Sequence, residues 1–292
     1  MYKQISANRT LSVVLIGFFL IILIGIGWFF TWYYHNFIYL IFISIIALVQ
    51  AFVSYWWSDS ISLSLAGAKP ASRKEYLSLH RAVENMAILA GIPKPKVYVV
   101  NDPAPNAFAT GRDPKHASLA ITTGLLEIMN KRQLEGVISH EMSHIGNRDT
   151  LVMTMVVVLV IIIAWVSDLF IRMQWFRGNR DRNEGGGILI IIGIIGLILA
   201  PIVAQLVKLA ISRKREYLAD ATGALMTRFP EGLAEALEKI KDKNSATKNT
   251  STATSHLYIA NPFKRKDSNW MSNLFATHPP IEDRIKKLRE MI

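Results

Sequence analysis

Long apolar runs alternate with polar stretches along this chain, and the first two runs predict a membrane anchor. Residues 11–30 contain no charged side chain, and twenty residues in a helix span a hydrocarbon core of about 30 Å. Residues 37–57 form a second charge-free run. Both runs have aromatic residues at their ends, as membrane interfaces favour. These residues are Trp28, Trp32, Tyr33, Tyr34, Trp56 and Trp57. We therefore expect residues 1–57 to form a transmembrane helical hairpin.

Basic residues indicate which way this hairpin faces. Lys3 and Arg9 precede the first run, basic residues at 69, 73 and 74 follow the second, and the linker 31–36 has neither Lys nor Arg. The positive-inside rule places the N-terminus and the chain after residue 57 in the cytoplasm. A cleaved signal peptide is the alternative for the first run, but the run is long for one and bulky aromatics follow it.

Residues 151–171 and 187–207 are two further apolar stretches, each long enough to span a membrane. Buried core helices are the alternative, but such helices are usually shorter and more amphipathic. We expect a second apolar hairpin over 151–211 that crosses the membrane twice. The linker 172–186 contains four arginines, whose export the positive-inside rule disfavours.

The remaining sequence forms two polar blocks, which we expect to make one cytoplasmic peptidase domain in two parts. The first, 58–150, has an amphipathic helical pattern at 76–90 and extended segments separated by prolines, as in a small sheet. The extended segments cover 96–100, 106–110 and 118–122. The second block, 212–292, has a helical pattern, and its polar stretch 241–255 predicts a mobile loop.

Composition excludes several classes of protein. Hydrophobic residues make up 51% of the chain and charged residues 19%, which argues against disorder and against an ordinary soluble enzyme. The chain has no cysteine, so a metal site must use His, Asp or Glu. The net charge of +11 suits an anionic membrane or a nucleic acid. The apolar runs favour the membrane, and the basic run 264–266 lacks the aromatic residues that single-stranded nucleic acid would stack on. We expect no nucleic acid partner.

The helical pattern at 133–146 contains His-Glu-Met-Ser-His, the first candidate metal site. His140 and His144 are four residues apart, so both imidazoles project from one helix face and can bind one ion. Glu141 flanks that face and can reach a water in the open coordination position. Solvated surface histidines are the alternative, which the apolar helix disfavours. Gly146 predicts the end of the helix.

A zinc site of this kind needs a third protein ligand, and Glu216 is the leading candidate. Asp220 lies one turn later on the same helical face, where its carboxylate could accept a hydrogen bond from a ligand imidazole. The alternative for Glu216 is a surface salt bridge with a neighbouring arginine. The spacing alone favours neither the metal ligand nor the salt bridge as the role of Glu216.

With these motifs, the chain resembles the membrane-embedded zinc metallopeptidases of the HtpX type, gluzincins related to the CAAX prenyl endopeptidases. The resemblance covers nearly the whole chain, including the apolar helices. Its motifs are NAFATG at 106–111, HEMSH at 140–144, EYLAD at 216–220 and THPP at 277–280. It implies a mostly α membrane protein with a helical peptidase domain, a small β-sheet and four apolar helices. It also implies one Zn²⁺ per chain, bound by His140, His144 and Glu216, with Glu141 as the general base.

The chemistry of such a site is consistent with these residues. Zinc lowers the pKa of a bound water to about 7, and Glu141 can take its proton during attack on a peptide carbonyl. The resemblance places the C-terminal His-Pro-Pro segment near the catalytic centre, so His278 and Arg284 are candidates for stabilising the oxyanion. A histidine held in a proline-stiffened turn is the alternative for His278.

The segment that begins at Asn106 resembles the family's edge strand beside the active-site helix. An exposed edge strand could bind an extended substrate by β-augmentation, which contacts the main chain and gives broad specificity. The candidate substrate-binding residues are Asn106, Ala107, Phe108 and Ala109. A simple core strand is the alternative, and the sequence does not separate the two.

We therefore expect a multi-pass zinc endopeptidase of the cytoplasmic (inner) membrane with its active site facing the cytoplasm. The resemblance implies that it cleaves misfolded or damaged membrane proteins, often under stress. A dedicated processing peptidase with one substrate is an alternative within the same class. A non-catalytic membrane scaffold and a channel or transporter are alternatives from other classes. Loss of Glu141 or of a ligand would have favoured the scaffold, and none is lost. A channel or transporter needs polar groups along several spans.

Overall fold

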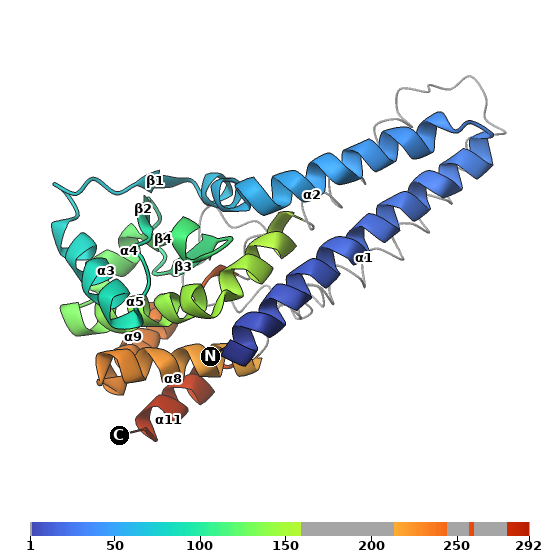
Figure 1. Cartoon of the computed structure of the whole chain (residues 1–292). Coiled ribbons are helices and arrows are strands. Elements are labelled where there is room, and N and C mark those ends of the chain that lie inside the picture. Colours follow the sequence, from blue (N-terminus) through green and yellow to red (C-terminus); the bar gives the residue numbers. More distant parts are fainter. Residues whose placement is uncertain (1, 159–212, 244–256, 260–278, 292) are drawn as a thin grey trace.

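Two long helices extend from one side of a mixed helical and β domain (Figure 1). The structure is a computed structural model, and it describes residues 2–158, 213–243, 257–259 and 279–291. The described part is mostly helical, with one small sheet.

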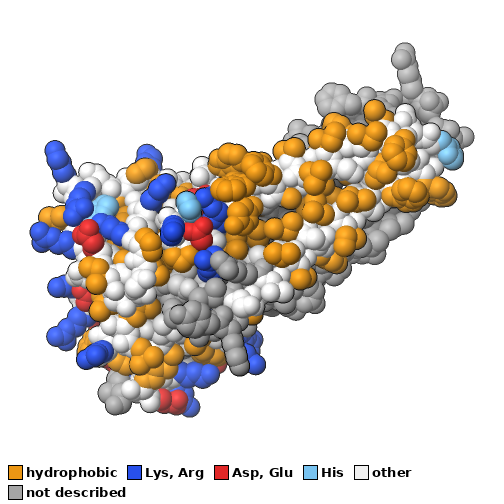
Figure 2. Space-filling model, viewed as in Figure 1, with side chains coloured by type: hydrophobic (Ala, Val, Ile, Leu, Met, Phe, Trp, Pro, Cys, Tyr) orange, Lys and Arg blue, Asp and Glu red, His pale blue; other side chains and the backbone are white. Residues whose placement is uncertain are grey.

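The two long helices are α1 (Tyr2–Tyr34) and α2 (Ile38–Leu65), which pack side by side as an antiparallel hairpin. By length and composition, both contain a segment that could cross a membrane, Ser6–Trp32 and Ile38–Leu65. Large apolar side chains lie on their outer surface (Figure 2), and most residues of both segments are not buried. Because a core helix of a soluble protein would bury that surface, the exposure supports the predicted hairpin. The helix α2 continues beyond the predicted boundary at residue 57.

The sheet has four strands in the order β1-β2-β4-β3. Its strands are β1 (Ala68–Pro70), β2 (Lys96–Val100), β3 (Ala107–Gly111) and β4 (Ala117–Thr122). The strands β2 and β4 are parallel, whereas β1 and β3 are antiparallel to their neighbours. The three predicted extended segments match β2, β3 and β4 to within one residue. The short strand β1 was not predicted.

The helix α5 (Lys131–Asn147) lies at the centre of the domain and packs against β3 and the surrounding helices. Asn130 begins it with a capping box that includes Gln133. Its apolar positions, Val137, Ile138, Met142 and Ile145, are fully buried in the core. The predicted end at Gly146 lies within one residue of the observed end at Asn147. The helix ends where Arg148 adopts a left-handed conformation, with φ of 59°.

The other helices surround α5 and the sheet. These helices are α3 (Leu77–Ala90), α4 (Thr123–Ile128), α8 (Arg213–Thr227), α9 (Pro230–Lys243) and α11 (Ile281–Arg289), with a short 3-10 turn η1 (Pro114–His116). The helices α3, α8 and α9 contact α5 directly, and α11 contacts α8 and α9. The second polar block is therefore helical where it is described, and α9 includes the first three residues of the predicted loop 241–255.

The predicted second hairpin lies mostly outside the described residues. Its first residues belong to a short apolar helix, Asp149–Val158, whose apolar side chains are buried. Residues 159–212, including the arginine-rich linker, are not described, so the four-helix membrane region stays an expectation. His278 and the basic run 264–266 also lie outside the described residues.

Candidate metal centre

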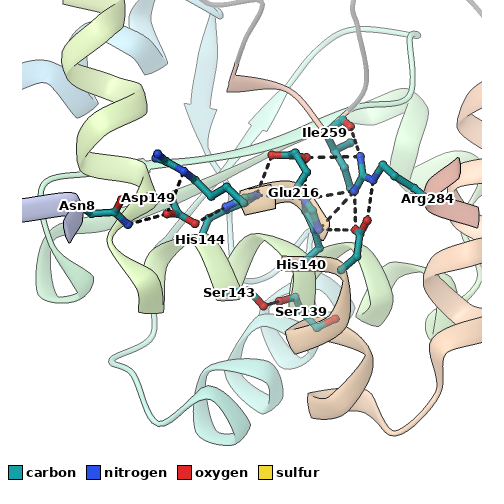
Figure 3. A network of polar contacts seen from close by, with 11 residues as sticks. Asn8, Ser139, His140, Ser143, His144, Asp149, Glu216, Ile259 and Arg284 are labelled. Atoms are coloured by element: carbon teal, nitrogen blue, oxygen red, sulfur yellow. Dashed lines mark hydrogen bonds and ion pairs between the residues drawn. The ribbon is translucent and has the colours of Figure 1, made fainter. Parts of the chain in front are cut away.

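The two histidines of the motif lie on one face of α5 and point toward each other (Figure 3). The side chains of His140 and His144 are 1% and 4% exposed. Their Nε2 atoms are 3.2 Å apart, and the two rings are perpendicular. The one-turn spacing therefore brings both imidazoles to one buried point.

Glu216 reaches this point from the first turn of α8. Its carboxylate oxygens lie 3.7 Å from Nε2 of His140 and 3.5 Å from Nε2 of His144. One ligand atom from each of the three residues can be chosen so that all lie within 4.8 Å of one another. A buried His-His-Glu group is thus a possible metal site.

A glycine sets the distance between the two helices at this site. Gly223 lies on α8, and a Cβ atom added to it would be 2.9 Å from Oγ of Ser139 and 3.0 Å from the backbone nitrogen of His140. Ordinary carbon contacts are about 3.5–4.0 Å. Only glycine permits this approach, which brings Glu216 and Asp220 of α8 up to the histidines of α5.

Two carboxylates lie behind the histidines and fix their orientation. Oδ1 of Asp220 is 2.9 Å from Nδ1 of His140, and Oδ2 of Asp149 is 2.9 Å from Nδ1 of His144. A carboxylate accepts, so each Nδ1 donates a hydrogen and each Nε2 keeps its lone pair for the shared point. The sequence indicated Asp220 but missed Asp149. The one feature of the sequence that could have indicated Asp149 is its position two residues after the end of the motif helix.

The donor set fits a zinc ion. In a tetrahedral site with Zn–N bonds of about 2.0–2.1 Å, two ligand nitrogens lie about 3.3 Å apart. The two Nε2 atoms match that separation, and the oxygens of Glu216 are only slightly farther away. Two lone pairs facing each other at this distance repel unless a proton or a metal ion lies between them. The arrangement is therefore one that a metal ion would fit.

The electrostatics of the site also favour a cation. Burial opposes protonation of His144, but its hydrogen bond to Asp149 and the charge of Glu216 raise its pKa to about 9. Burial lowers the pKa of His140, whereas Asp220 opposes that shift. The negative surroundings that attract a proton to His144 would equally stabilise a metal ion, whose binding releases that proton.

Arg284 of α11 lies in the same buried cluster. Its guanidinium donates two hydrogen bonds to Asp220, of 2.7 and 2.9 Å, and a third of 2.9 Å to the carbonyl of Ile259. One of its nitrogens is also 3.6 Å from Glu216. Against the effect of burial, Arg284 and the hydrogen bond from His140 lower the pKa of Asp220 to about 2. Asp220 is therefore ionised as it accepts from His140.

Glu141 is buried beside the ligands and faces the sheet. Burial raises its pKa to about 7, with a further increase from the charge of Glu216. The charge of His144 and a hydrogen bond from the backbone N–H of Ala109 act in the opposite direction. The carboxylate is thus tied to β3, with a pKa close to neutral.

The predicted substrate strand lies at the edge of the sheet beside α5, but it is buried. Its residues Asn106, Ala107, Phe108 and Ala109 are each 3% exposed or less. The carbonyl of Ala107 accepts a hydrogen bond of 3.0 Å from the backbone N–H of Ile259. The ring of Tyr258 packs on Phe108, with centroids 5.1 Å apart. The segment Leu257–Ile259, which the sequence did not reveal, therefore covers part of this edge.

Comparison with known proteins identifies the family. The family model described as Peptidase family M48 matches residues 73–292, which is most of the chain. The chain belongs to peptidase family M48. The predicted resemblance is confirmed, and the chain is a metallo-endopeptidase.

Full-length relatives agree with this assignment. The chain is 47% identical to a Protease HtpX homolog of Caldanaerobacter subterraneus, with 100% of the chain and 98% of the relative covered. It is 49% identical to one of Pyrococcus furiosus, with 84% of each covered. Among solved structures, the crystal structure of S. mikatae Ste24p matches with a TM-score of 0.52 and 18% identity. That match covers 99% of this chain and 67% of Ste24p, and it shows a shared fold for this M48 peptidase.

Proposed function

We propose that this M48 peptidase is a membrane-anchored zinc endopeptidase that cleaves misfolded or damaged membrane proteins at the cytoplasmic face. The observation that carries the proposal is the buried His140, His144 and Glu216 cluster beside Glu141, in a chain with an exposed apolar hairpin. The ligand chemistry supports hydrolysis, and the hairpin would keep the site close to membrane substrates.

In this mechanism the histidines and Glu216 hold zinc, and Glu141 moves the proton. When bound, zinc would supply a water of lowered pKa and polarise the peptide carbonyl. Glu141 takes the proton as the water attacks and delivers it to the leaving nitrogen. Burial raises the pKa of Glu141 above that of an exposed carboxyl, and the charge of a bound ion would lower it again. Asp220 and Asp149 keep the two imidazoles oriented.

His278 and Arg284 are proposed to stabilise the oxyanion. The contacts of Arg284 indicate which of the two would do so directly. Its guanidinium already binds Asp220 and the carbonyl of Ile259, and the side chain is fully buried. These contacts favour a positioning role, in which Arg284 holds Asp220 and Asp220 holds His140. His278 is then the candidate for direct contact with the oxyanion.

The strand β3 is proposed to bind the substrate main chain. Outward backbone groups of Ala107 and Ala109 face Ile259 and Glu141 rather than β4, so this edge lies directly beside the proposed base. An extended substrate that pairs along Asn106, Ala107, Phe108 and Ala109 would replace the contact of Leu257–Ile259. Such pairing uses main-chain hydrogen bonds and accepts many sequences, as quality control requires.

The proposed topology follows from the ligand positions. His140 and His144 precede the second apolar region, and Glu216 follows it, so the chain between them crosses the membrane an even number of times. We propose two crossings within 151–211, with the peptidase domain (58–150 and 212–292) in the cytoplasm and the anchor at 1–57.

The test uses the full chain purified in detergent. Wild-type protein should contain one zinc per chain and degrade an unfolded protein such as casein, and a chelator should stop it. The variant Glu141→Gln should retain zinc and lose at least about a hundredfold in rate, because it keeps the size but removes the base. Glu135→Gln, on the same helix but away from the site, is the matched control. A Glu141→Gln variant with near-normal turnover would refute the mechanism.

Substrate choice is tested separately in liposomes. The enzyme is reconstituted with a membrane protein and with a destabilised variant of it that has the same cleavable sequence. Quality control predicts faster cleavage of the destabilised form. Equal rates for the two, with cleavage at one fixed sequence, would instead support a dedicated processing peptidase.

A further inference from the structure

We propose that Asn8, on the first apolar helix, is a positioning residue for the metal ligand His144 and acts through Asp149. The proposal rests on the zinc site proposed above. It makes the helix α1 a part of the metal centre as well as an anchor.

The contacts form a short chain from α1 to the metal site (Figure 3). Nδ2 of Asn8 lies 2.7 Å from Oδ1 of Asp149 and donates a hydrogen bond to it. The other oxygen of the same carboxylate, Oδ2, accepts from Nδ1 of His144 at 2.9 Å. His144 then presents Nε2 to the shared point with His140. Only one residue therefore separates the anchor helix from a proposed zinc ligand.

The same amide group also holds the end of the metal helix. Nδ2 of Asn8 donates to the backbone carbonyl of Asn147 at 2.9 Å. Asn147 is the last residue of α5, where carbonyls no longer have partners within the helix. The two hydrogens of one side-chain amide thus serve a free helix carbonyl and the Asp149 carboxylate together.

The burial of Asn8 indicates that these bonds matter. The residue is 5% exposed in a helix that is otherwise predominantly apolar. A buried amide is unfavourable unless it is hydrogen-bonded, and an apolar side chain would have filled the same space without that requirement. What the amide provides, and an apolar side chain does not, is a donor to the carboxylate that orients His144.

The neutral amide suits this role. Nε of Arg215 approaches the same Oδ1 atom at 3.5 Å, so Asp149 is held on one side by Asn8 and Arg215 and on the other by His144. Because Asn8 adds no charge, it fixes the carboxylate while leaving its negative charge to increase the basicity of the imidazole. The rotation of Asp149, and with it the ring of His144, is restricted.

The test measures zinc affinity of the full chain in detergent by competition with a chromophoric chelator. Asn8→Leu keeps the branching and the number of side-chain heavy atoms but removes both donors. We expect its zinc dissociation constant to rise about three- to tenfold, less than the ten- to hundredfold typical of a residue that bonds a ligand directly. Ser12→Ala is the matched control, because Ser12 is similarly buried on α1 and its hydroxyl donates to the carbonyl of Asn8 rather than to Asp149 or the end of α5. It should bind zinc as the wild type does.

A double-mutant cycle separates positioning from a general effect on folding. If Asn8 acts through Asp149, then Asn8→Leu should change zinc affinity little in an Asp149→Ala background. A loss of the same size in both backgrounds would overturn the proposal. Asn8→Asp provides a second variant of native shape, which removes the donors and places two carboxylates together, and wild-type zinc affinity in this variant would also overturn it.

The outcome also separates this inference from the proposed function. Glu216→Ala removes a ligand and should abolish tight zinc binding. If Glu216→Ala loses zinc while Asn8→Leu binds it as the wild type does, the inference fails and the zinc site stands. If the wild type itself binds no zinc, both fail.

Discussion

Replacement of Gly223 by alanine tests whether the close approach of α5 and α8 builds the metal site. The added Cβ would lie 2.9 Å from Oγ of Ser139 and 3.0 Å from the backbone nitrogen of His140. These distances are shorter than ordinary contacts by roughly 0.5–1 Å. The Ser139 hydroxyl can rotate away, but the backbone of α5 cannot, so the two helices must move apart.

The sign of the effect on stability distinguishes this reasoning from a simple helix-propensity argument. In a helix interior, alanine is favoured over glycine by about 1 kcal/mol, so an unstrained Gly223→Ala would stabilise the protein. Overpacking against backbone costs up to about 3 kcal/mol. The net expectation is a free energy of unfolding lower by up to roughly 2 kcal/mol, which corresponds to a melting temperature lower by up to about 8 °C for a chain of this size.

The assay combines thermal unfolding with zinc affinity. A separation of a few tenths of an ångström also moves Glu216 and Asp220 away from the histidines, and metal sites tolerate only about 0.5 Å of displacement. Gly223→Ala should therefore weaken zinc binding as well. Leu225→Ala, at an exposed position two residues along α8, is the control and should change neither property appreciably. A melting temperature equal to or above that of the wild type would refute the reasoning.

Four further predictions concern the ligands, the junction with the membrane anchor and the topology. Glu216→Ala should lose zinc and activity together, measured by metal analysis and casein cleavage; stoichiometric zinc at normal affinity would point to another third ligand. Asp220→Ala should weaken zinc binding by about ten- to a hundredfold in the chelator competition, because His140 loses its acceptor. The guanidinium of Arg112 lies 4.5 Å from the ring centre of Trp56, so Arg112→Ala should cost about 0.5–1 kcal/mol in thermal unfolding. Finally, Gly178→Cys should react with an impermeant thiol reagent from outside cells stripped of any outer membrane; labelling only after lysis would contradict the two-crossing model.

Local patterns predicted the parts of the fold whose cause is local. The spacing of His140 and His144 requires one helix turn, and the apolar positions of the same segment fix which face is buried. The apolar runs 11–30 and 37–57 predicted the hairpin because the length of a run and its lack of charge are also local features of the sequence. The end of α5 was predicted to within one residue, but the residue that takes the left-handed conformation there is Arg148 and not Gly146.

Contacts that depend on tertiary structure or on the exact path of a turn were the least predictable. Asp149 is only five residues from His144, but it reaches that ring because the chain turns at Arg148, after the end of α5. Ile259 bonds to Ala107 of β3, and Asn8 bonds to Asn147 at the end of α5. Each contact joins elements that are more than a hundred residues apart in the sequence. No periodicity or motif reports such contacts, because they arise from tertiary structure.

The position of Arg284 on the last helix has a consequence for the time at which this peptidase becomes active. Chains fold from the N-terminus as they are synthesised. The motif helix is made early, but Glu216 follows His144 by 72 residues (216 − 144), and the guanidinium that fixes Asp220 follows later still. A nascent or truncated chain that ends before Arg284 therefore contains the motif without its completed surroundings. The surroundings of His140 are therefore completed only after residue 284 has been synthesised.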